Sequence, residues 1–522
     1  MKLTLVPRPA QKRSIAAGVL RFFVRLLLLL LLFMTILCIW AVRNYSNISL
    51  EEVIFYLSMP LRGTAQQFTH ALIRYVLLPV AGLTLLLVMA VLLPWKKELR
   101  LVTRGRAVRL LPLRLPLPLL AAAAVLWACI LYPIGDNLLG ITKFLDGRIH
   151  QSRLIEENYA DPAKVSLTFP EKKRNLITLY IESEESTNQD PENGGLMDKN
   201  YIPELTQLAR DNVSFSQNEL IAGAAVAPAC GWTVAGLVAQ TAGIPLKFYQ
   251  YDTANVDNMG ADLENFLPGA TMLGDILEAQ GYRNVFLCGS DFDFGGRRQL
   301  YAQHGAYEIY DYYAAMDNGW IPEGYSYGWG FEDQRMYEMA KNLLTELAAG
   351  DQPFHLGLLT VDTHDPGWLC DLCPQTDGNI YGRVVQCSSK QAADFVAWCQ
   401  EQPWYADTAI VITGDHASMS KSFYIDSAAK YTKHKGDTNR LVYNVFLNAD
   451  AEPVQMKNRK FTTMDFFPTV LSAMGVSIEG ERLGLGTNLF SDRQTLSEEL
   501  GYDTLFAELN KKSNFYDLKL LR

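Results

Sequence analysis

The stretch "TAIVITGDHAS", Thr408–Ser418, places an uninterrupted apolar run directly before a glycine, an aspartate and a histidine. A short apolar run rich in Ile and Val is typical of a strand that is buried on both faces, as strands of parallel sheets are. Such a strand would present Asp415 and His416 side by side where it ends. The stretch therefore predicts an α/β sheet with a charged pair at one edge.

Three further stretches have the same design. They are "NLITLYIES", "NVFLCGSD" and "FHLGLLTVDTHDP", at Asn175–Ser183, Asn284–Asp291 and Phe354–Pro366. Segments with helical spacing lie between them, at Pro203–Asp211, Thr271–Gln280 and Glu332–Ala349. Buried strands that alternate with helices indicate one large α/β domain, in which a central, mostly parallel sheet is flanked by helices.

Each predicted strand ends in a polar, reactive side chain. The residues concerned are Glu182, Asp291, His364 and the pair Asp415 and His416. In open parallel sheets, ligands bind beyond the carboxyl ends of the strands, and these ends lie at one edge. We therefore expect these side chains to line one site.

The ligand chemistry of this edge favours a metal ion. Glu182, Asp415 and His416 would form a hard, mostly oxygen site for a divalent cation such as Mn²⁺, Mg²⁺ or Zn²⁺. A fourth ligand is missing from that set, and the hydroxyl of Thr233 could supply it.

Thr233 itself has two interpretations. It lies in "PACGWTVAGLVAQTAGIPL", Pro228–Leu246, where a turn leads into a predicted helix, and a Thr at a helix start is commonly an N-cap. A hydroxyl activated by a base or a metal can also serve as a nucleophile, and a helix N-terminus favours phosphate binding. Gly231 and Gly236 would allow close approach of the backbone. The residues alone leave both interpretations open.

The first part of the chain is of another kind. Three apolar stretches, at 22–42, 75–95 and 115–134, have the length of membrane-spanning helices. Lys and Arg gather before the first stretch and between the second and third, which predicts that these segments are cytoplasmic and that the chain after the third stretch is extracytoplasmic. We predict a membrane domain at 1–140, a juxtamembrane connector at 141–170 and a catalytic domain at 171–522.

Charge divides in the same way. Residues 1–150 carry a net charge of +13, and the remainder carries −22. An acidic soluble domain argues against a nucleic acid as partner. An anionic substrate would therefore need local cations or a metal ion.

Six cysteines fall in the predicted extracytoplasmic part: Cys230, Cys288, Cys370, Cys373, Cys387 and Cys399. An oxidising compartment favours disulfides, although six cysteines allow 15 pairings. Alternatively, the "CDLC" stretch at Cys370–Cys373 could form a structural zinc site with Cys387 and Cys399.

Several of these motifs, in this order, resemble a known family. "NLITLYIES", "GWTVAGLVAQTAGIPL", "GYRNVFLCGSDFDFGG", "LTVDTHDP", "VITGDH" and "TTMDFFPTVLSAMGV" are similar to the motifs of the alkaline-phosphatase/sulfatase superfamily. Within it, the chain looks like the membrane-anchored phosphoglycerol transferases that serve osmoregulated-glucan and lipoteichoic acid synthesis. Enzymes of the sulfatase branch need Cys or Ser in a Cys-x-Pro-x-Arg context. Cys230 is followed by Gly-Trp-Thr-Val, which does not fit, so the motif argues against sulfatase activity.

The resemblance implies roles for individual residues. Glu182, Thr233, Asp415 and His416 match the metal-binding positions, and Thr233 matches the nucleophile. His364 matches a residue that contacts the phosphoglycerol group. Arg297 falls near a phosphate-holding basic residue, with Arg298 as the alternative, and Asp291 is a candidate contact for the glycerol hydroxyls.

The implied reaction is transfer of phosphoglycerol from phosphatidylglycerol to a glycan or glycolipid, through a phospho-threonine intermediate and with one divalent metal ion. Mn²⁺ is the expected metal, with Mg²⁺ or Zn²⁺ as alternatives. The implied location is the bacterial inner membrane, with several spans and an extracytoplasmic catalytic domain. The main alternative is a phosphoethanolamine transferase acting on lipid A or a glycan. A phosphodiesterase that uses water and a non-catalytic membrane sensor are two further alternatives.

Overall fold

The computed structural model describes residues 2–521 apart from 8–14, 45–47, 59–69, 71–72, 88–96, 104–105, 112–116, 248–264, 376–377 and 428–439. It divides into two compact units. The first comprises Met1–Asn44 and Ala65–Ile141, and the second comprises Tyr45–Thr64 and Thr142–Arg522. The predicted boundaries of the membrane domain, the connector and the catalytic domain stay predictions.

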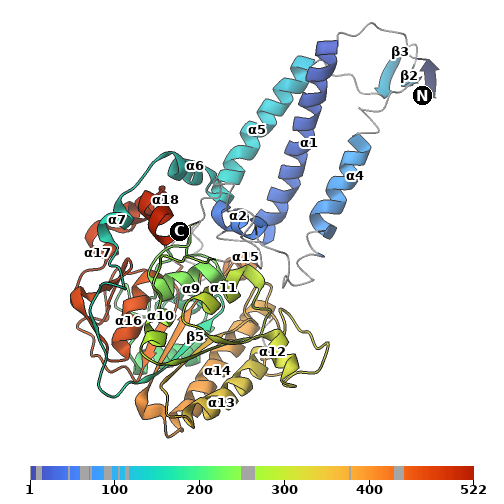
Figure 1. Cartoon of the computed structure of the whole chain (residues 1–522). Coiled ribbons are helices and arrows are strands. Elements are labelled where there is room, and N and C mark those ends of the chain that lie inside the picture. Colours follow the sequence, from blue (N-terminus) through green and yellow to red (C-terminus); the bar gives the residue numbers. More distant parts are fainter. Residues whose placement is uncertain are drawn as a thin grey trace. The chain divides into compact units, whose positions relative to one another are not determined.

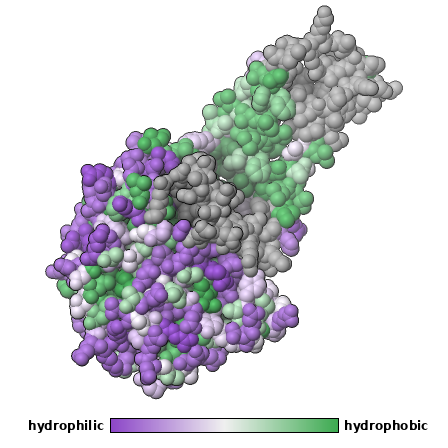
Figure 2. All heavy atoms as spheres, viewed as in Figure 1, coloured by the Kyte–Doolittle hydropathy of each residue, from purple (hydrophilic) through white to green (hydrophobic). Residues whose placement is uncertain are grey.

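The first unit contains three helices, α1 (Ile15–Asn44), α4 (Leu78–Leu87) and α5 (Leu117–Leu139), among its described residues. Two stretches, Phe22–Asn44 and Pro118–Leu139, are long and apolar enough to cross a membrane. Apolar side chains cover the surface of α1 and α5 (Figure 2). The predicted span at 75–95 is apolar and helical as far as Leu87, and its remaining residues lie outside the described part of the chain.

Strands also occur in the first unit. β1 (Lys2–Pro7), β2 (Lys97–Thr103) and β3 (Arg106–Leu111) form an antiparallel sheet from segments that sequence patterns assigned to loops.

The second unit is built on a six-stranded sheet in the order β10-β9-β5-β8-β6-β7. All neighbours pair in parallel except β10, which is antiparallel to β9. This confirms the predicted α/β fold with a mostly parallel sheet. The strands are β5 (Asn175–Ile181), β6 (Arg283–Cys288), β7 (Glu308–Tyr310), β8 (Phe354–Leu359), β9 (Thr408–Gly414) and β10 (Asn444–Leu447).

Helices cover both faces of this sheet (Figure 1). One face carries α8 (Pro203–Asp211), α13 (Asp333–Ala348) and α14 (Ile380–Gln400). The other face carries α9 (Thr233–Ala242), α10 (Leu273–Ala279), α11 (Arg297–Gln303) and α16 (Phe466–Ala473). Because the sheet is buried on both faces, its strands read as continuous apolar runs.

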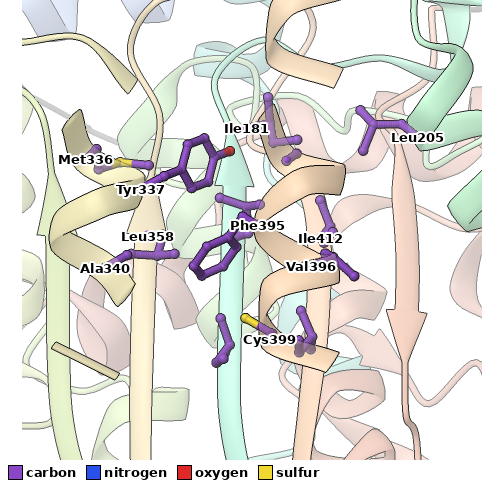
Figure 3. Close-up of a cluster of buried hydrophobic side chains, with 14 of the residues drawn as sticks. Ile181, Leu205, Met336, Tyr337, Ala340, Leu358, Phe395, Val396, Cys399 and Ile412 are labelled. Atoms are coloured by element: carbon purple, nitrogen blue, oxygen red, sulfur yellow. The ribbon is translucent and has the colours of Figure 1, made fainter. Parts of the chain in front are cut away.

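Strand β5 shows how one strand serves two cores. Ile177, Leu179 and Ile181 pack in the cluster that α13 and α14 complete, and Figure 3 shows Ile181 there with Leu358 and Ile412 of the neighbouring strands. Leu176 and Tyr180 point to the opposite face. The period of two along a strand produces this division, and both cores fix the strand in register.

The other elements of the second unit are short. They are α2 (Leu50–Ser58), α6 (Ile141–Ile149), α7 (Leu154–Asn158), β4 (Leu167–Thr168), α12 (Tyr312–Asp317), α15 (Lys421–Asp426), β11 (Ser477–Ile478), β12 (Arg482–Leu483), β13 (Gly486–Thr487), α17 (Leu496–Leu500) and α18 (Tyr502–Asn510).

Candidate active site

The carboxyl ends of two neighbouring strands, β5 and β9, form the centre of the site. Glu182 follows β5, and Asp415 and His416 follow β9, which pairs in parallel with β5. The structure brings one ligand atom of each of these three residues within 4.8 Å of the others. All three side chains are buried, with 3% or less of their surface exposed.

Thr233 completes this group from the start of helix α9. Its Oγ1 lies 3.4 Å from Glu182 Oε2 and 3.3 Å from His416 Nε2. The capping position belongs to Trp232, whose side chain makes no capping hydrogen bond, and Thr233 is the first helical residue. The hydroxyl is therefore directed at the acidic cluster, and the helix-cap interpretation does not describe its contacts.

Backbone groups hold the Asp415 carboxylate in place. Its Oδ1 accepts hydrogen bonds from the backbone N–H groups of Ser183 and His416, both at 2.8 Å. Its Oδ2 is buried and accepts no hydrogen bond from the described residues. Because a buried carboxylate oxygen normally has a partner, this oxygen is placed to bind a ligand that the protein itself does not supply.

Histidine 416 is oriented for the same purpose. Its Nδ1 lies 2.9 Å from the carbonyl oxygen of Ala417, which fixes the proton on Nδ1 as the donor. The other ring nitrogen, Nε2, then lies 3.5 Å from Glu182 Oε1 and 3.4 Å from Asp415 Oδ2. A backbone carbonyl on one ring nitrogen and an open lone pair on the other is the arrangement of a metal-binding histidine.

The cluster is electrostatically strained without a cation. Burial raises the pKa of Asp415 to about 7, and the negative charge of Glu182 acts in the same direction. Burial would lower the pKa of His416, but the charges of Asp415 and Glu182 outweigh it and raise the pKa to about 9. Burial likewise raises the pKa of Glu182, yet the positive charges of His416 and His364 dominate and hold it below its usual value. Two buried carboxylates and an imidazole fit a divalent metal ion.

Close packing of α9 against the end of β9 sets the position of Thr233. A Cβ on Gly236 would lie 2.1 Å from the carbonyl oxygen of Asp415, so only glycine permits this approach. One turn further on, Gln240 donates from Nε2 to the Gly414 carbonyl at 2.9 Å, and its Oε1 accepts from the Thr413 hydroxyl at 2.7 Å. Thr233, Gly236 and Gln240 lie three to four residues apart, on one face of the helix.

Gly236→Ala is expected to destabilise the fold by about 1–3 kcal/mol, because the added methyl group must push α9 away from Asp415. Gly231→Ala is the matched control: a Cβ there would meet only Val226 Cγ1, at 3.8 Å. Thermal denaturation of the two variants should show a lowered midpoint for Gly236→Ala alone. Equal midpoints would mean that the helix does not depend on this contact.

His364 follows β8, the strand on the other side of β5. Its ring stacks near Trp329, with the two ring centroids 4.4 Å apart, and its Nδ1 lies 3.1 Å from the Asp365 carbonyl oxygen. The side chain is half-buried, and its charge lowers the pKa of Glu182. The structure thus places His364 at the same edge as Glu182, within electrostatic range.

Arg297 and Arg298 begin helix α11 but differ in their partners. Arg297 is 5% exposed, and its guanidinium donates to the carbonyl oxygens of Asp291 at 2.7 Å and Phe294 at 3.0 Å. No carboxylate among the described residues pairs with it. The Arg298 side chain is more exposed and pairs with Asp293 and Asp311. Of the two, only Arg297 has a buried positive charge without a protein carboxylate.

Asp291 is buried in the turn that follows β6. Its Oδ1 accepts from the backbone N–H of Asp293 at 2.9 Å, and its carbonyl receives the Arg297 guanidinium. The residue therefore shapes the turn between β6 and α11 that positions Arg297.

Sequence patterns did not single out the residues that support Glu182. Ser183 adopts a left-handed backbone conformation with φ of 57°, which lets its N–H reach Asp415 while its hydroxyl donates to Glu182 Oε1 at 2.6 Å. Thr360 Oγ1 accepts from the Glu182 N–H at 2.9 Å. A strained residue at a strand end marks functional sites, but a serine carries no sequence signal of its backbone angle.

The chain is similar to curated proteins and to solved structures. The curated phosphoglycerol transferase I of Escherichia coli O6:K15:H31 (strain 536 / UPEC) is 32% identical over 372 residues, which cover 70% of this chain and 44% of that protein. The protein of that name from Salmonella choleraesuis (strain SC-B67) is 32% identical over 348 residues, covering 65% and 41%. The chain spans less than half the length of these curated relatives.

Among solved structures, the lipoteichoic acid synthase LtaP from Listeria monocytogenes aligns with a TM-score of 0.47 and 18% identity, covering 65% of this chain and 82% of that one. Residues 174–476, which include Glu182, Thr233, His364, Asp415 and His416, match the family model described as Sulfatase. That range is more than half of the 522 residues. The chain therefore belongs to the sulfatase family.

Proposed function

We propose that this protein transfers a phosphoglycerol group from phosphatidylglycerol to a hydroxyl of a glycan or glycolipid. The observation that carries the proposal is the Thr233 hydroxyl, which lies 3.3–3.4 Å from His416 and Glu182 at the start of a helix. The names of the relatives at 32% identity support the choice of group. Because the chain spans less than half of those relatives, the activity, substrates and partners are proposed for it.

The reaction proceeds in two displacements at phosphorus. Thr233 Oγ1 forms a bond to the phosphorus of the donor, and the bond to the diacylglycerol oxygen breaks. The Thr233 proton passes to Glu182 Oε2, 3.4 Å away, and His364 protonates the departing oxygen. In the second step an acceptor hydroxyl bonds to phosphorus and gives its proton to His364, while the bond from phosphorus to Thr233 Oγ1 breaks. Thr233 Oγ1 regains its proton from Glu182, which restores the starting state. The first step yields diacylglycerol and a phosphoglyceryl-threonine.

The chain offers two groups for the negative charge on the phosphoryl oxygens. The first turn of a helix has backbone N–H groups without intrahelical partners, so the N-terminus of α9 favours an anion beside Thr233. The Arg297 guanidinium, buried without a carboxylate partner, supplies the second.

Glu182, Asp415 and His416 are the residues that would hold a divalent metal ion, with Thr233 within reach of the same position. When bound, the ion would supply positive charge that favours the ionised hydroxyl and offsets phosphate charge. We propose Mn²⁺, because a site of carboxylate and hydroxyl oxygens with one imidazole suits a harder ion.

We propose the bacterial inner membrane as the location, with the catalytic unit on the extracytoplasmic side. Two helical stretches with the length and apolarity of membrane spans support an anchored protein. An anchored protein fits a donor that is itself a membrane lipid. The distribution of Lys and Arg in the sequence gives the orientation.

Arg297→Gln is expected to lower kcat/KM for phosphatidylglycerol by about 10²-fold, because a buried charge beside the phosphate would be lost. Arg298→Gln should change it little, since that side chain is already paired with Asp293 and Asp311. Release of diacylglycerol from lipid–detergent micelles measures both. The reverse ranking would assign phosphate contact to Arg298.

The proposal is tested with the full chain in detergent, Mn²⁺ and phosphatidylglycerol labelled in its head group, with no acceptor. Mass spectrometry of the peptide that carries Thr233 should show a glycerophosphate adduct. A parallel reaction uses phosphatidylethanolamine labelled in the same way.

Three results would contradict the proposal in different ways. An adduct from phosphatidylethanolamine alone would make the protein a phosphoethanolamine transferase. Steady release of glycerophosphate without any acceptor would make it a phosphodiesterase that uses water. Metal binding without an adduct or product from either lipid would indicate a protein that binds but does not transfer.

A further inference from the structure

Three cysteine side chains outside the active site meet in a small buried cluster. The Sγ atom of Cys370 lies 3.7 Å from that of Cys373 and 3.6 Å from that of Cys387, and all three lie within 4.8 Å of one another. Their exposed fractions are between 4% and 8%. Leu369 packs beside the three cysteines, and this cluster is separate from the larger hydrophobic cores.

Two local structures bring the sulfurs together. Cys370 and Cys373 occupy the ends of a tight turn, in which the Cys373 N–H donates to the Cys370 carbonyl at 3.2 Å. Cys387 comes from the second turn of α14. Cys399 lies twelve residues further along the same helix, about 18 Å away at 1.5 Å per residue, and is part of the core beneath the sheet. The sequence suggested a zinc site of four cysteines. Cys399 lies too far from the other three to be a ligand, so that part of the prediction is wrong.

The spacing of the sulfurs suits a shared ion. A tetrahedral zinc site with Zn–S bonds of about 2.3 Å separates its sulfurs by about 3.8 Å. The Cys370–Cys387 and Cys370–Cys373 sulfur distances, 3.6 and 3.7 Å, are close to that value. A disulfide, by contrast, joins two sulfurs at about 2.05 Å and would leave the third thiol buried without a partner of its kind.

A glutamine beside the cluster supports charged sulfurs. Gln391 lies one turn after Cys387 in α14, and its Nε2 lies 3.3 Å from Cys387 Sγ and 3.7 Å from Cys370 Sγ. An amide N–H directed at two sulfurs is the kind of outer contact that orients thiolate ligands.

We propose that Cys370, Cys373 and Cys387 bind a structural zinc ion as thiolates. Binding exchanges the three S–H protons for the ion, and the protons leave to solvent. A water molecule completes the tetrahedron from the side of the turn, where Asp371 and Leu372 are exposed. Soft thiolate ligands select zinc over the harder ions proposed for the active site.

The consequence for the fold is a link between the active-site edge and α14. Cys370 lies six residues after His364, and the intervening loop is also held by Tyr327, whose hydroxyl donates to the Leu369 carbonyl. The ion would fasten the end of this loop to the helix. The ion would position the loop and take no part in the reaction. In the described part of the chain, none of the three sulfurs contacts Glu182, Asp415 or His416.

The test uses the full chain in detergent, purified without chelator and then reduced and stripped of metal. Co²⁺ is added as the probe, because thiolate ligands give an intense near-ultraviolet charge-transfer band that carboxylate and imidazole ligands do not give. We expect this band at one equivalent of Co²⁺, and its loss on addition of Zn²⁺. Co²⁺ bound by Glu182, Asp415 and His416 would not contribute to this band, because that group contains no thiolate.

The variants separate ligands from structure. Cys373→Ser should lose the band or most of its intensity, whereas Cys399→Ser, a buried cysteine outside the cluster, should keep it. Metal analysis of the protein as purified should show one zinc ion in the wild type that Cys373→Ser lacks. A native disulfide among the three cysteines, found by alkylation and mass spectrometry before reduction, would overturn the proposal. So would the absence of the band in fully reduced wild-type protein, a measurement that needs no variant to fold.

Discussion

Thr233→Ala is expected to abolish the glycerophosphate adduct and to lower the rate of transfer by on the order of 10³ or more. The change removes the hydroxyl that lies within 3.4 Å of both Glu182 and His416. The helix should survive, because Thr233 is the first helical residue and makes no capping hydrogen bond, and alanine is a good helix former. Thr233→Ser should retain activity, since it keeps the hydroxyl.

Thr241→Ala is the control on the same helix. Thr241 is also buried, but it lies about two helical turns after Thr233, and its hydroxyl donates to the Leu237 carbonyl at 2.7 Å. Its loss should lower stability by about 1 kcal/mol and leave transfer intact. If Thr233→Ala forms an adduct at the same rate as the wild type, another residue is the nucleophile, whatever the geometry at α9.

Four strands of the second unit, β5, β6, β8 and β9, were predictable because they are buried on both faces. "LITLYI" and "AIVITG" need apolar side chains at every position, which makes the pattern continuous and easy to distinguish. Parallel pairing then placed Glu182 beside Asp415 and His416, which is how the metal ligands could be grouped from the sequence. The edge strand β10 was not predicted, because its four residues are too few to show a pattern.

The sequence could not decide whether Thr233 is a helix cap or a nucleophile. The decision depends on whether the helix begins at Thr233 or one residue later. If the helix began one residue later, Thr233 would be the cap; it begins at Thr233. Sequence patterns locate helix ends less accurately than that. The cysteines illustrate the same limit. Cys387 and Cys399 looked equally available as ligands only because α14, which separates them along its axis, had not been predicted.

The sequence predicted close backbone approach at Gly231 and Gly236, and the structure confirms it for Gly236. Gly236 does allow close approach of the backbone, with Asp415 as the neighbour, whereas Gly231 has ordinary space around it. A sequence shows that a glycine is present but not which backbone segment approaches it. The hydrogen bonds of Arg297 and His364 are to neighbouring backbone carbonyls and do not test a contact with substrate, so the substrate roles of these residues stay predictions.

Asp415→Asn is expected to separate stability from function. The amide keeps an oxygen for the N–H groups of Ser183 and His416, but it replaces the unpartnered Oδ2 with a donor and removes a charge. Without metal, the wild-type carboxylate is unfavourable: burial and the charge of Glu182 raise its pKa to about 7. A raised carboxyl pKa means that the folded state binds more protons than the unfolded state between about pH 4 and 7, so stability falls as pH rises through that window.

The variant should therefore be at least as stable as the wild type in chelator at pH 7, and its stability should fall less between pH 4 and 7. With metal the order should reverse: Asp415→Asn should gain no stability from Mn²⁺ and should lose about 10³ in transfer rate. Denaturant titrations with chelator and with Mn²⁺ measure both stabilities.

Asp465→Asn is the matched control, because that buried carboxylate accepts hydrogen bonds from the backbone N–H groups of Thr462 and Thr487 and lies outside the site. Stabilisation of both variants by Mn²⁺ to the wild-type extent would rule out Asp415 as a metal ligand.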